Sequence, residues 1–253
     1  MMNFVKYAQY YNFLYKDKDY RKEADYVERL IKRYSGKRNR TLLDIGCGTG
    51  NHDIWFAKKG YQVVGVDKAR KMIDIARKRI TAGQRVEFCV SDISKLVLRR
   101  KFDAAVSLFH VMSYLTTNDI FIKSLRSIYK HLKKGSLFIF DFWYGPAVLT
   151  QRPVRRAKSI VDKNIDIRRT TIPNFDFNEN TVDVNYKVTA LNKKSGLIEI
   201  VNEVHKMRYF FLPELDFMLK QSGFKIVKSF KWLSISNPLS PASWSGVVVA
   251  KRE

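Results

Sequence analysis

A glycine-rich loop at residues 44–50 is the part of the sequence whose residue types and spacing point most directly to chemistry. It reads Asp-Ile-Gly-Cys-Gly-Thr-Gly and follows a short apolar run. Glycines between a strand and a helix let the backbone approach a ligand closely and present N–H groups at the start of the helix. A dinucleotide pattern, Gly-x-Gly-x-x-Gly, fits Gly46 and Gly48 but fails at Asn51, and a pyrophosphate would sit badly beside Asp44. The loop therefore favours a ligand with positive charge over a dinucleotide.

The segments around this loop alternate in a way that predicts a Rossmann-like α/β fold. Strand-like segments occur at 41–45, 61–66, 86–90, 102–107 and 136–140, and helix-like segments at 19–34, 52–59, 70–80 and 118–132. We expect Gly135 to end the last of these helices. The alternation predicts a mostly parallel sheet with helices on both faces, whose ligands bind at the carboxyl ends of the strands. The residues at those ends are Asp44, Asp67, Asp92, Ser107 and Asp141.

Residues 42–50 resemble the first motif of class I S-adenosylmethionine-dependent methyltransferases. Asp67 follows the loop by 17 residues, as does the acid of that family that accepts the ribose hydroxyls, and residues 91–93 resemble the segment beside the adenine. The similarity covers residues 41–141. S-adenosylmethionine carries a sulfonium and an ammonium group but no phosphate, which agrees with an acidic loop. The resemblance implies a cofactor site formed by Asp44, Gly46, Cys47, Gly48, Gly50, Asp67, Lys68, Asp92, Ile93, Ser107 and Phe109.

The N-terminal segment gives a narrower resemblance. Residues 11–20 are similar to the start of the N,N-dimethyltransferases that act on nucleotide-linked amino sugars. In that group tyrosines of this segment close over the cofactor, which implies the same role for Tyr11 and Tyr15; the alternative is that they pack the first helix onto the sheet. Residues 140–144, Phe-Asp-Phe-Trp-Tyr, resemble the acidic and aromatic exit from the fifth strand of the same group. The group tends to place a histidine where this chain has Tyr114, so the exact substrate stays open.

Three side chains near the strand ends are candidates for catalysis of methyl transfer: His110, Tyr114 and Asp141. The reaction mainly needs an aligned acceptor lone pair and a dry site, and a base helps when the acceptor is a hydroxyl or a protonated amine. His110 suits proton transfer near neutral pH, Tyr114 can donate a hydrogen bond or line the pocket, and Asp141 can orient an amine. Each has a purely structural alternative. The remaining histidines, His52, His131 and His205, are expected to be structural or exposed.

A set of aromatic residues near the ends of strands is a candidate for a flat wall that would hold a sugar or a base. The alternative for each of them is a place in the hydrophobic core. These residues are Trp143, Tyr144, Trp232 and Trp244.

Residues 154–209 depart from the strand–helix alternation and predict an antiparallel insertion. Polar and apolar residues alternate at 165–171, 181–191 and 197–208, and residues 192–196 read as a hairpin loop. We expect this insertion to cover the acceptor pocket or to form a dimer contact. The Rossmann-like domain would then comprise residues 1–153 and 210–253, with a helix opening at Pro213 before the last strands.

Bulk composition limits the classes of protein that fit. The 253-residue chain has only two cysteines, Cys47 and Cys89, which form no paired ligand pattern, so neither a disulfide framework nor a metal site is expected. No apolar run reaches the roughly 20 residues of a membrane helix, and no apolar signal core begins the sequence. We therefore expect no membrane span and a cytoplasmic location.

The formal net charge of +23 has two interpretations. It reflects either a solvated, lysine-rich surface or a field that attracts an anion. Residues 151–170 hold seven basic and two acidic side chains. Arg152, Arg155 and Arg156 follow the fifth strand closely enough to return to the pocket mouth, where an arginine fork would suit a phosphate.

The leading hypothesis is methylation of a small-molecule acceptor, an amine on a phosphate-bearing nucleotide sugar. An RNA or protein methyltransferase is an alternative that the charge favours. Residues 107–110, Ser-Leu-Phe-His, lack the acidic or amide residue, two prolines and aromatic of most base amino-methyltransferases, which makes nucleic acid the less favoured partner. A cofactor-binding protein without turnover is a third reading, and a homodimer is an expected assembly to test.

Overall fold

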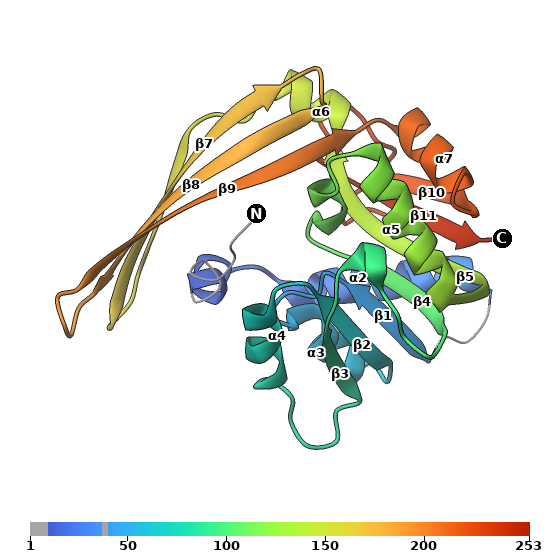
Figure 1. Cartoon of the computed structure of the whole chain (residues 1–253), viewed down its shortest axis with the longest axis horizontal. Helices are drawn as coiled ribbons and strands as arrows, with labels where there is room; N and C mark the ends of the chain where they lie inside the picture. Colours follow the sequence, from blue (N-terminus) through green and yellow to red (C-terminus); the bar gives the residue numbers. More distant parts are fainter. Residues whose placement is uncertain (1–9, 37–39) are drawn as a thin grey trace.

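The computed structural model describes residues 10–36 and 40–253 and is centred on a parallel sheet with helices on both faces (Figure 1). The parallel strands are β1 (Thr41–Ile45), β2 (Gln62–Asp67), β3 (Val86–Val90), β4 (Phe102–Ser107) and β5 (Leu132–Tyr144). They lie in the order β3-β2-β1-β4-β5, so the first strand is in the middle, β2 and β3 follow on one side of it, and β4 and β5 on the other. This order confirms the predicted α/β class and leaves a crevice where it reverses, between the carboxyl ends of β1 and β4.

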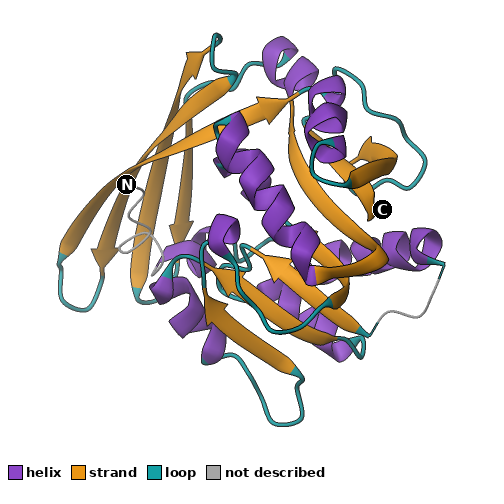
Figure 2. Cartoon of the chain, turned by 45° about the vertical axis from the view of Figure 1, so that its right-hand side comes forward, coloured by secondary structure: helices purple, strands orange, loops and turns teal. Residues whose placement is uncertain are grey.

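Helices cover the two faces of this sheet (Figure 2). One face packs against α2 (Tyr20–Ser35) and α3 (Asn51–Lys58), and the other against α5 (Asn118–His131) and α7 (Leu212–Lys220), while α4 (Arg70–Arg77) lies beside β2 and β3. Short helical turns η1 (Ile93–Lys95) and η2 (Val111–Tyr114) and helix α6 (Gly145–Thr150) follow strands. Alternation along β1 explains the two cores, because Leu42 packs under α2 and its neighbour Leu43 packs under α5.

The beginning of β5 differs from the prediction. Gly135 was expected to end the preceding helix, yet α5 ends at His131 and β5 starts at the next residue. Gly135 instead has φ +74° inside the strand, and the pairing with β4 jumps from Phe102–Leu132 to Ala104–Leu137. The glycine therefore marks a bulge, a place where a strand needs backbone that other residues rarely adopt.

The antiparallel insertion is attached to the far end of β5. Its strands are β6 (Arg156–Val161), β7 (Ile165–Asp176), β8 (Thr181–Asn192) and β9 (Ile198–Phe210), each paired with the next; β6 was not predicted. β5 is longer than β4, and its last two residues, Trp143 and Tyr144, pair in parallel with Tyr209 and Phe210 of β9. The long strands sweep away from this junction (Figure 1). The other edge of β5 pairs with β11 (Ser245–Arg252), which pairs with β10 (Phe224–Lys231).

The N-terminal segment packs against the insertion. Leu14 is fully buried and Tyr10 nearly so, in a cluster with Ile167, Val188 and Val201 of the insertion strands. The chain thus crosses from the insertion to α2, and the space between the insertion and the parallel sheet is closed on this side by residues 10–20. This arrangement differs from the predicted alternative in which the tyrosines pack the first helix onto the sheet.

Candidate active site

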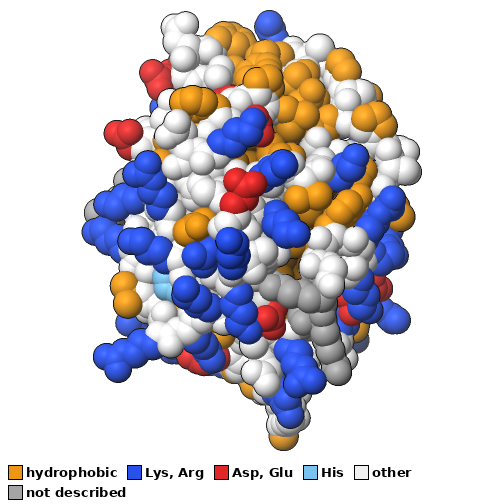
Figure 3. Space-filling model, turned by 90° about the vertical axis from the view of Figure 1, so that its right-hand side faces the viewer, with side chains coloured by type: hydrophobic (Ala, Val, Ile, Leu, Met, Phe, Trp, Pro, Cys, Tyr) orange, Lys and Arg blue, Asp and Glu red, His pale blue; other side chains and the backbone are white. Residues whose placement is uncertain are grey.

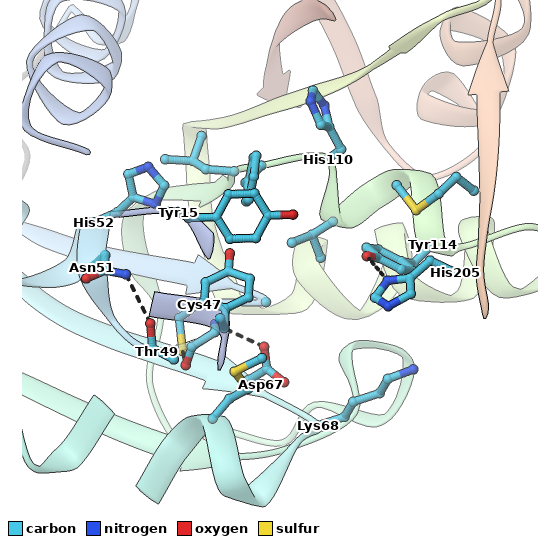
Figure 4. Close-up of a pocket in the computed structure, with 18 of the residues that line it drawn as sticks. Tyr15, Cys47, Thr49, Asn51, His52, Asp67, Lys68, His110, Tyr114 and His205 are labelled. Carbon is cyan, nitrogen blue, oxygen red and sulfur yellow. Dashed lines mark hydrogen bonds between the residues drawn. The ribbon is translucent and has the colours of Figure 1, made fainter. Parts of the chain in front are cut away.

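A cavity of about 660 Å³ opens at the carboxyl ends of β1, β2 and β4 and extends to the insertion strands (Figure 4). Its size lies within the usual range for sites that enclose a small ligand. Most of the residues predicted for the site line it: Tyr11, Tyr15, Asp44, Gly46, Cys47, Gly48, Asp67, Lys68, Asp92, Ile93, Phe109, His110 and Tyr114. The structure therefore brings together residues that are spread over more than 100 positions of the sequence.

Three predicted site residues do not line the cavity. Gly50 caps α3 and packs so closely that a Cβ there would lie 2.5 Å from the ring of Phe88. The hydroxyl of Ser107 is buried and donates to the carbonyl of Ile45 at 2.9 Å. Asp141 lies behind His110. A contact of these residues with a ligand stays a prediction, and their observed contacts are with the protein.

The glycine loop forms the floor of the cavity because of its backbone conformation. Gly46 and Gly48 have φ of +74° and +56°, a region that disfavours residues with a Cβ. A Cβ on Gly46 would lie 2.4 Å from Val111, whereas a Cβ on Gly48 would meet no atom within 4 Å. Since Gly48 lines the cavity, this open space is the cavity itself, and the bare backbone leaves room for a ligand there.

Asp67 at the end of β2 holds the loop and faces the cavity. Its carboxylate accepts hydrogen bonds from the backbone N–H of Gly48 at 3.0 Å and of Ala69 at 2.8 Å. A carboxylate has about four lone-pair sites, so acceptor capacity is left for ligand hydroxyls. Burial raises the pKa of Asp67. Asp92 accepts from the N–H and hydroxyl of Ser94 and lies on the same side of the cavity.

Two buried carboxyl groups lie beneath the loop, and they favour a positively charged ligand at the site. Asp44 at the end of β1 and Asp53 on α3 are both buried, and Asp44 Oδ2 and both Asp53 oxygens have no hydrogen-bond partner among the described residues. Burial and the mutual repulsion of these carboxyl groups raise the pKa of Asp44 well above its ordinary value, and burial also raises that of Asp53. A ligand with a sulfonium and an ammonium group would supply the missing positive charge. Asp44 lines the cavity, so the residues present fit S-adenosylmethionine; Asp53, which was not predicted, is fully buried and does not line the cavity.

Aromatic side chains of the N-terminal segment lie over the cavity. The rings of Tyr11 and Tyr15 are 4.8 Å apart, and Tyr15 meets Phe109 edge-on at 5.0 Å. The segment is tied to the glycine loop by the hydroxyl of Thr49, which donates to the side-chain oxygen of Asn12 at 3.0 Å. This placement agrees with the predicted closing of the two tyrosines over the cofactor, which remains a prediction.

His110 and Asp141 form a contact at the end of β4 and β5. The N–H of His110 donates to Asp141 Oδ1 at 3.0 Å, and the ring Nδ1 lies 2.9 Å from Oδ2 but without hydrogen-bond alignment. Phe109 and His110 have φ of +69° and +62°, which is strained for residues with side chains. Such strain often occurs at functional sites, and both Phe109 and His110 line the cavity.

Tyr114, the third catalytic candidate, meets a histidine that was expected to be structural or exposed. His205 of β9 is only 4% exposed, lines the cavity, and shares a 2.7 Å hydrogen bond between its Nδ1 and the hydroxyl of Tyr114 (Figure 4). Its other nitrogen lies 3.2 Å from Glu203 Oε2. His52 also lines the cavity and pairs with Glu23 at 2.7 Å.

The insertion supplies further cavity residues that the sequence did not indicate. Arg169 of β7 and Tyr186 of β8 line the cavity, and the Arg169 guanidinium lies 4.9 Å from the Tyr186 ring and donates to the Tyr15 hydroxyl at 3.0 Å. Of the three arginines predicted at the pocket mouth, only Arg156 lines it. Arg155 is exposed outside it, and Arg152 lies over the ring of Phe177. Arg156 is the first residue of β6, whereas Arg152 and Arg155 precede the strand.

The candidate aromatic wall divides into two pairs. Trp143 and Trp244 line the cavity with their rings 5.8 Å apart. Trp232 packs against Tyr26 of α2, and Tyr144 packs against the β5 core. Half of the predicted wall therefore belongs to the cavity and half to the protein interior.

The comparisons with known proteins agree with this geometry. Residues 42–135 match the model of a methyltransferase domain. A crystal structure of an S-adenosylmethionine-dependent methyltransferase from Clostridium acetobutylicum superposes with a TM-score of 0.83 at 21% identity over 98% of both chains. Residues 42–135 therefore contain a methyltransferase domain, and the fold and the glycine loop agree with the S-adenosylmethionine-dependent type.

Two further similarities lie among amino-sugar enzymes. The dTDP-3-amino-3,4,6-trideoxy-alpha-D-glucopyranose N,N-dimethyltransferase of Streptomyces venezuelae is 25% identical over 88% of this chain and 91% of its own length. An amino pentose methyltransferase from Micromonospora echinaspora, solved with bound S-adenosylmethionine, has a TM-score of 0.76 at 22% identity, covering 98% of this chain and 96% of that one. The predicted resemblance to the amino-sugar N-methyltransferases is confirmed. Among the described residues, no helix is long and apolar enough to cross a membrane.

Proposed function

We propose that the protein transfers a methyl group to the amino group of a small acceptor that carries a diphosphate, as in a nucleotide-linked amino sugar. S-adenosylmethionine supplies an electrophilic methyl on a sulfonium whose leaving group is neutral. The residues of this chain then have to bind the acceptor, orient its nitrogen lone pair and exclude water.

The observation that carries the proposal is a pair of arginines that the insertion contributes to the cavity wall. Arg156 of β6 and Arg169 of β7 line the same cavity as Gly48 and Asp67. In the antiparallel pairing Arg156 lies opposite Thr171, so Arg169 is its diagonal neighbour on the same face. Two guanidinium groups on one face suit the oxygens of a diphosphate. The similarity to a dTDP-amino-sugar N,N-dimethyltransferase supports the same acceptor class.

The remaining charge supports no single alternative. The face in Figure 3 carries many Lys and Arg side chains in separate groups, with few acidic side chains between them. A broad positive field would attract RNA weakly, through phosphates and without a defined site. RNA is therefore tested as a second acceptor in the experiment below.

The experiment measures steady-state methylation of a dTDP-linked amino sugar by the parent and by Arg156→Glu. We expect turnover by the parent and a rise of about tenfold or more in KM for the sugar in the variant, because a charge-assisted contact of about 1.5–3 kcal/mol is lost. Affinity for S-adenosylhomocysteine should not change.

Arg155→Glu is the matched control, since it makes the same charge change one residue away and outside the cavity. An equal rise in KM for both variants would mean that general charge, rather than this site, attracts the acceptor. Turnover of RNA but not of the sugar by the parent would refute the proposed acceptor.

A further inference from the structure

The acceptor side of the cavity contains a line of three polar side chains. The Tyr114 hydroxyl on η2 and His205 Nδ1 on β9 are 2.7 Å apart, although 91 residues separate them in the chain. His205 Nε2 lies 3.2 Å from Glu203 Oε2, two residues earlier on the same face of β9. Tyr114 and His205 line the cavity, and Glu203 lies behind them. Figure 4 shows the hydroxyl and the imidazole joined at one side of the cavity.

The partners of the imidazole determine which of its nitrogens carries the proton. A carboxylate only accepts, so Nε2 donates to Glu203 and Nδ1 is left as an acceptor. The hydroxyl of Tyr114 is then the donor to Nδ1. Because the hydroxyl donates its proton to Nδ1, the lone pairs of the Tyr114 oxygen can act as hydrogen-bond acceptors. Tyr114 lines the cavity.

The surroundings of His205 include other titratable and charged groups. The Tyr186 ring of β8 meets the imidazole edge-on at 4.8 Å. Behind it, the Arg169 guanidinium of β7 lies 4.9 Å from the Tyr186 ring and 5.6 Å from the Tyr15 ring. Glu203 is the acidic group in direct contact with the imidazole, so its carboxylate would stabilise an imidazolium there.

We propose that Tyr114, His205 and Glu203 form a proton relay that removes a proton from the acceptor ammonium group. The relay rests on the proposed function, because it needs an amine acceptor. The N–H bond of the ammonium breaks and its electron pair stays on nitrogen as the attacking lone pair. The proton moves to the Tyr114 oxygen, the hydroxyl proton of Tyr114 moves to His205 Nδ1, and the resulting imidazolium is paired with Glu203. Proton loss from His205 to solvent restores the starting state.

Tyr114 cannot perform this step alone. Burial raises the pKa of Tyr114 well above its ordinary value, and the neighbouring Tyr186 raises it further, so a free phenolate does not form near neutral pH. The hydroxyl must give up one proton as it takes another, and His205 is placed to receive it. In this scheme Tyr114 is the group that touches the acceptor, and His205 and Glu203 act through it.

The test is the pH dependence of kcat for the parent, Tyr114→Phe, His205→Gln and Glu203→Gln with a saturating dTDP-linked amino sugar. We expect kcat to fall about 100-fold for Tyr114→Phe and for His205→Gln, the scale of lost acid–base catalysis. The acidic limb of the kcat profile should disappear in His205→Gln. Glu203→Gln should lower kcat by a smaller factor, because the imidazolium formed in the step then lacks its anionic partner.

Affinity for S-adenosylhomocysteine and thermal stability are measured for each variant, so that a folding defect is recognised. If His205→Gln does not fold, Tyr114→Phe and Glu203→Gln decide the question, because both nearly keep the shape of the side chain. Tyr129→Phe is the matched control: its hydroxyl donates to the backbone oxygen of Glu253, away from the cavity, and its loss should leave kcat and the pH profile unchanged.

The outcomes separate the relay from the proposed function. A parent that does not methylate the sugar amine overturns the proposed function and the relay together. A parent that does, with a His205→Gln variant whose kcat stays within about twofold and whose pH profile is unchanged, overturns the relay alone. A loss confined to KM would likewise refute it, since a group that only binds the acceptor would give that result.

Discussion

The two halves of the cavity are built in different ways. The proposed cofactor half consists of residues 44, 46–49, 51–52, 67–68 and 92–93, at the ends of three neighbouring parallel strands, and its key contacts involve backbone. The acceptor half takes Arg156, Arg169, Tyr186 and His205 from four different strands of the insertion, and side chains form its surface. The first half depends on local backbone geometry, and the second on the register of long antiparallel strands.

Because of this difference, substitutions in the two halves should act separately. A change in the glycine loop alters the shape of the cofactor half without moving the insertion strands. A change on β6–β9 alters the acceptor wall without moving the loop. The two halves meet at β5, whose final residues pair with β9, and at the N-terminal segment, which contacts both.

The largest expected effect is that of Gly48→Val on the cofactor half. The added side chain would enter the cavity, and φ of +56° would strain it by about 1–2 kcal/mol. Isothermal titration should give an affinity for S-adenosylhomocysteine more than about 100-fold weaker than that of the parent. Gly36→Val is the control, since Gly36 has φ +63° at the end of α2 with no atom within 4 Å of its Cβ position. Gly36→Val should lower stability but leave the affinity for S-adenosylhomocysteine unchanged. Equal affinity of the parent and Gly48→Val would show that Gly48 does not border the cofactor.

Asp67→Ala should have the next largest effect. It removes the predicted acceptor for the ribose hydroxyls and the observed acceptor for the N–H of Gly48, so we expect a loss of about 1.5–3 kcal/mol, or roughly 10- to 100-fold in affinity for S-adenosylhomocysteine. KM for the acceptor, measured at saturating cofactor, should stay near that of the parent. Asp74→Ala, an exposed acid on α4, is the matched control. Unchanged affinity for S-adenosylhomocysteine in Asp67→Ala would show that the end of β2 does not contact the cofactor.

The smallest expected effect on activity comes from Glu23→Gln, which should act on the stability of the protein and not on either half of the cavity. Burial raises the pKa of Glu23, but hydrogen bonding to His52 and the charges of His52 and Lys18 outweigh it and lower the pKa to about 2. The stabilisation is therefore complete above the ordinary value of 4.5 and is lost as pH falls toward about 2. Urea unfolding at pH 7 should show a loss of about 1.5–3 kcal/mol in the variant.

At pH 3 the difference between parent and Glu23→Gln should be smaller than at pH 7. Asp216→Asn, which removes an exposed ion pair with Lys220, should change stability by no more than about 1 kcal/mol. A gap between parent and Glu23→Gln that stays constant with pH would show that the carboxylate charge is not its source.

The same division explains what could be predicted from the sequence. The parallel strands, the loop and Asp67 follow from hydrophobic runs and from glycines and acids at strand ends, all of which are local signals. The sequence analysis missed Arg169, Tyr186 and His205. The face of the insertion sheet on which each side chain lies depends on strand register, and a shift of one residue would place each on the opposite face. Glu203, His205 and Met207 do alternate along the predicted strand, so a polar pair on one face was a usable signal. The sequence contains no signal that Asp53 is buried, since nothing local distinguishes a buried helical acid from a solvated one.

A labelled methyl group shows directly which acceptor the protein methylates. The parent protein is incubated with methyl-labelled S-adenosylmethionine, a dTDP-linked amino sugar and bulk RNA together, and the products are separated and analysed by mass spectrometry. We expect label on the sugar nitrogen, with the sugar gaining one or more methyl groups and the RNA gaining none. Label on RNA with an unmodified sugar would contradict this expectation.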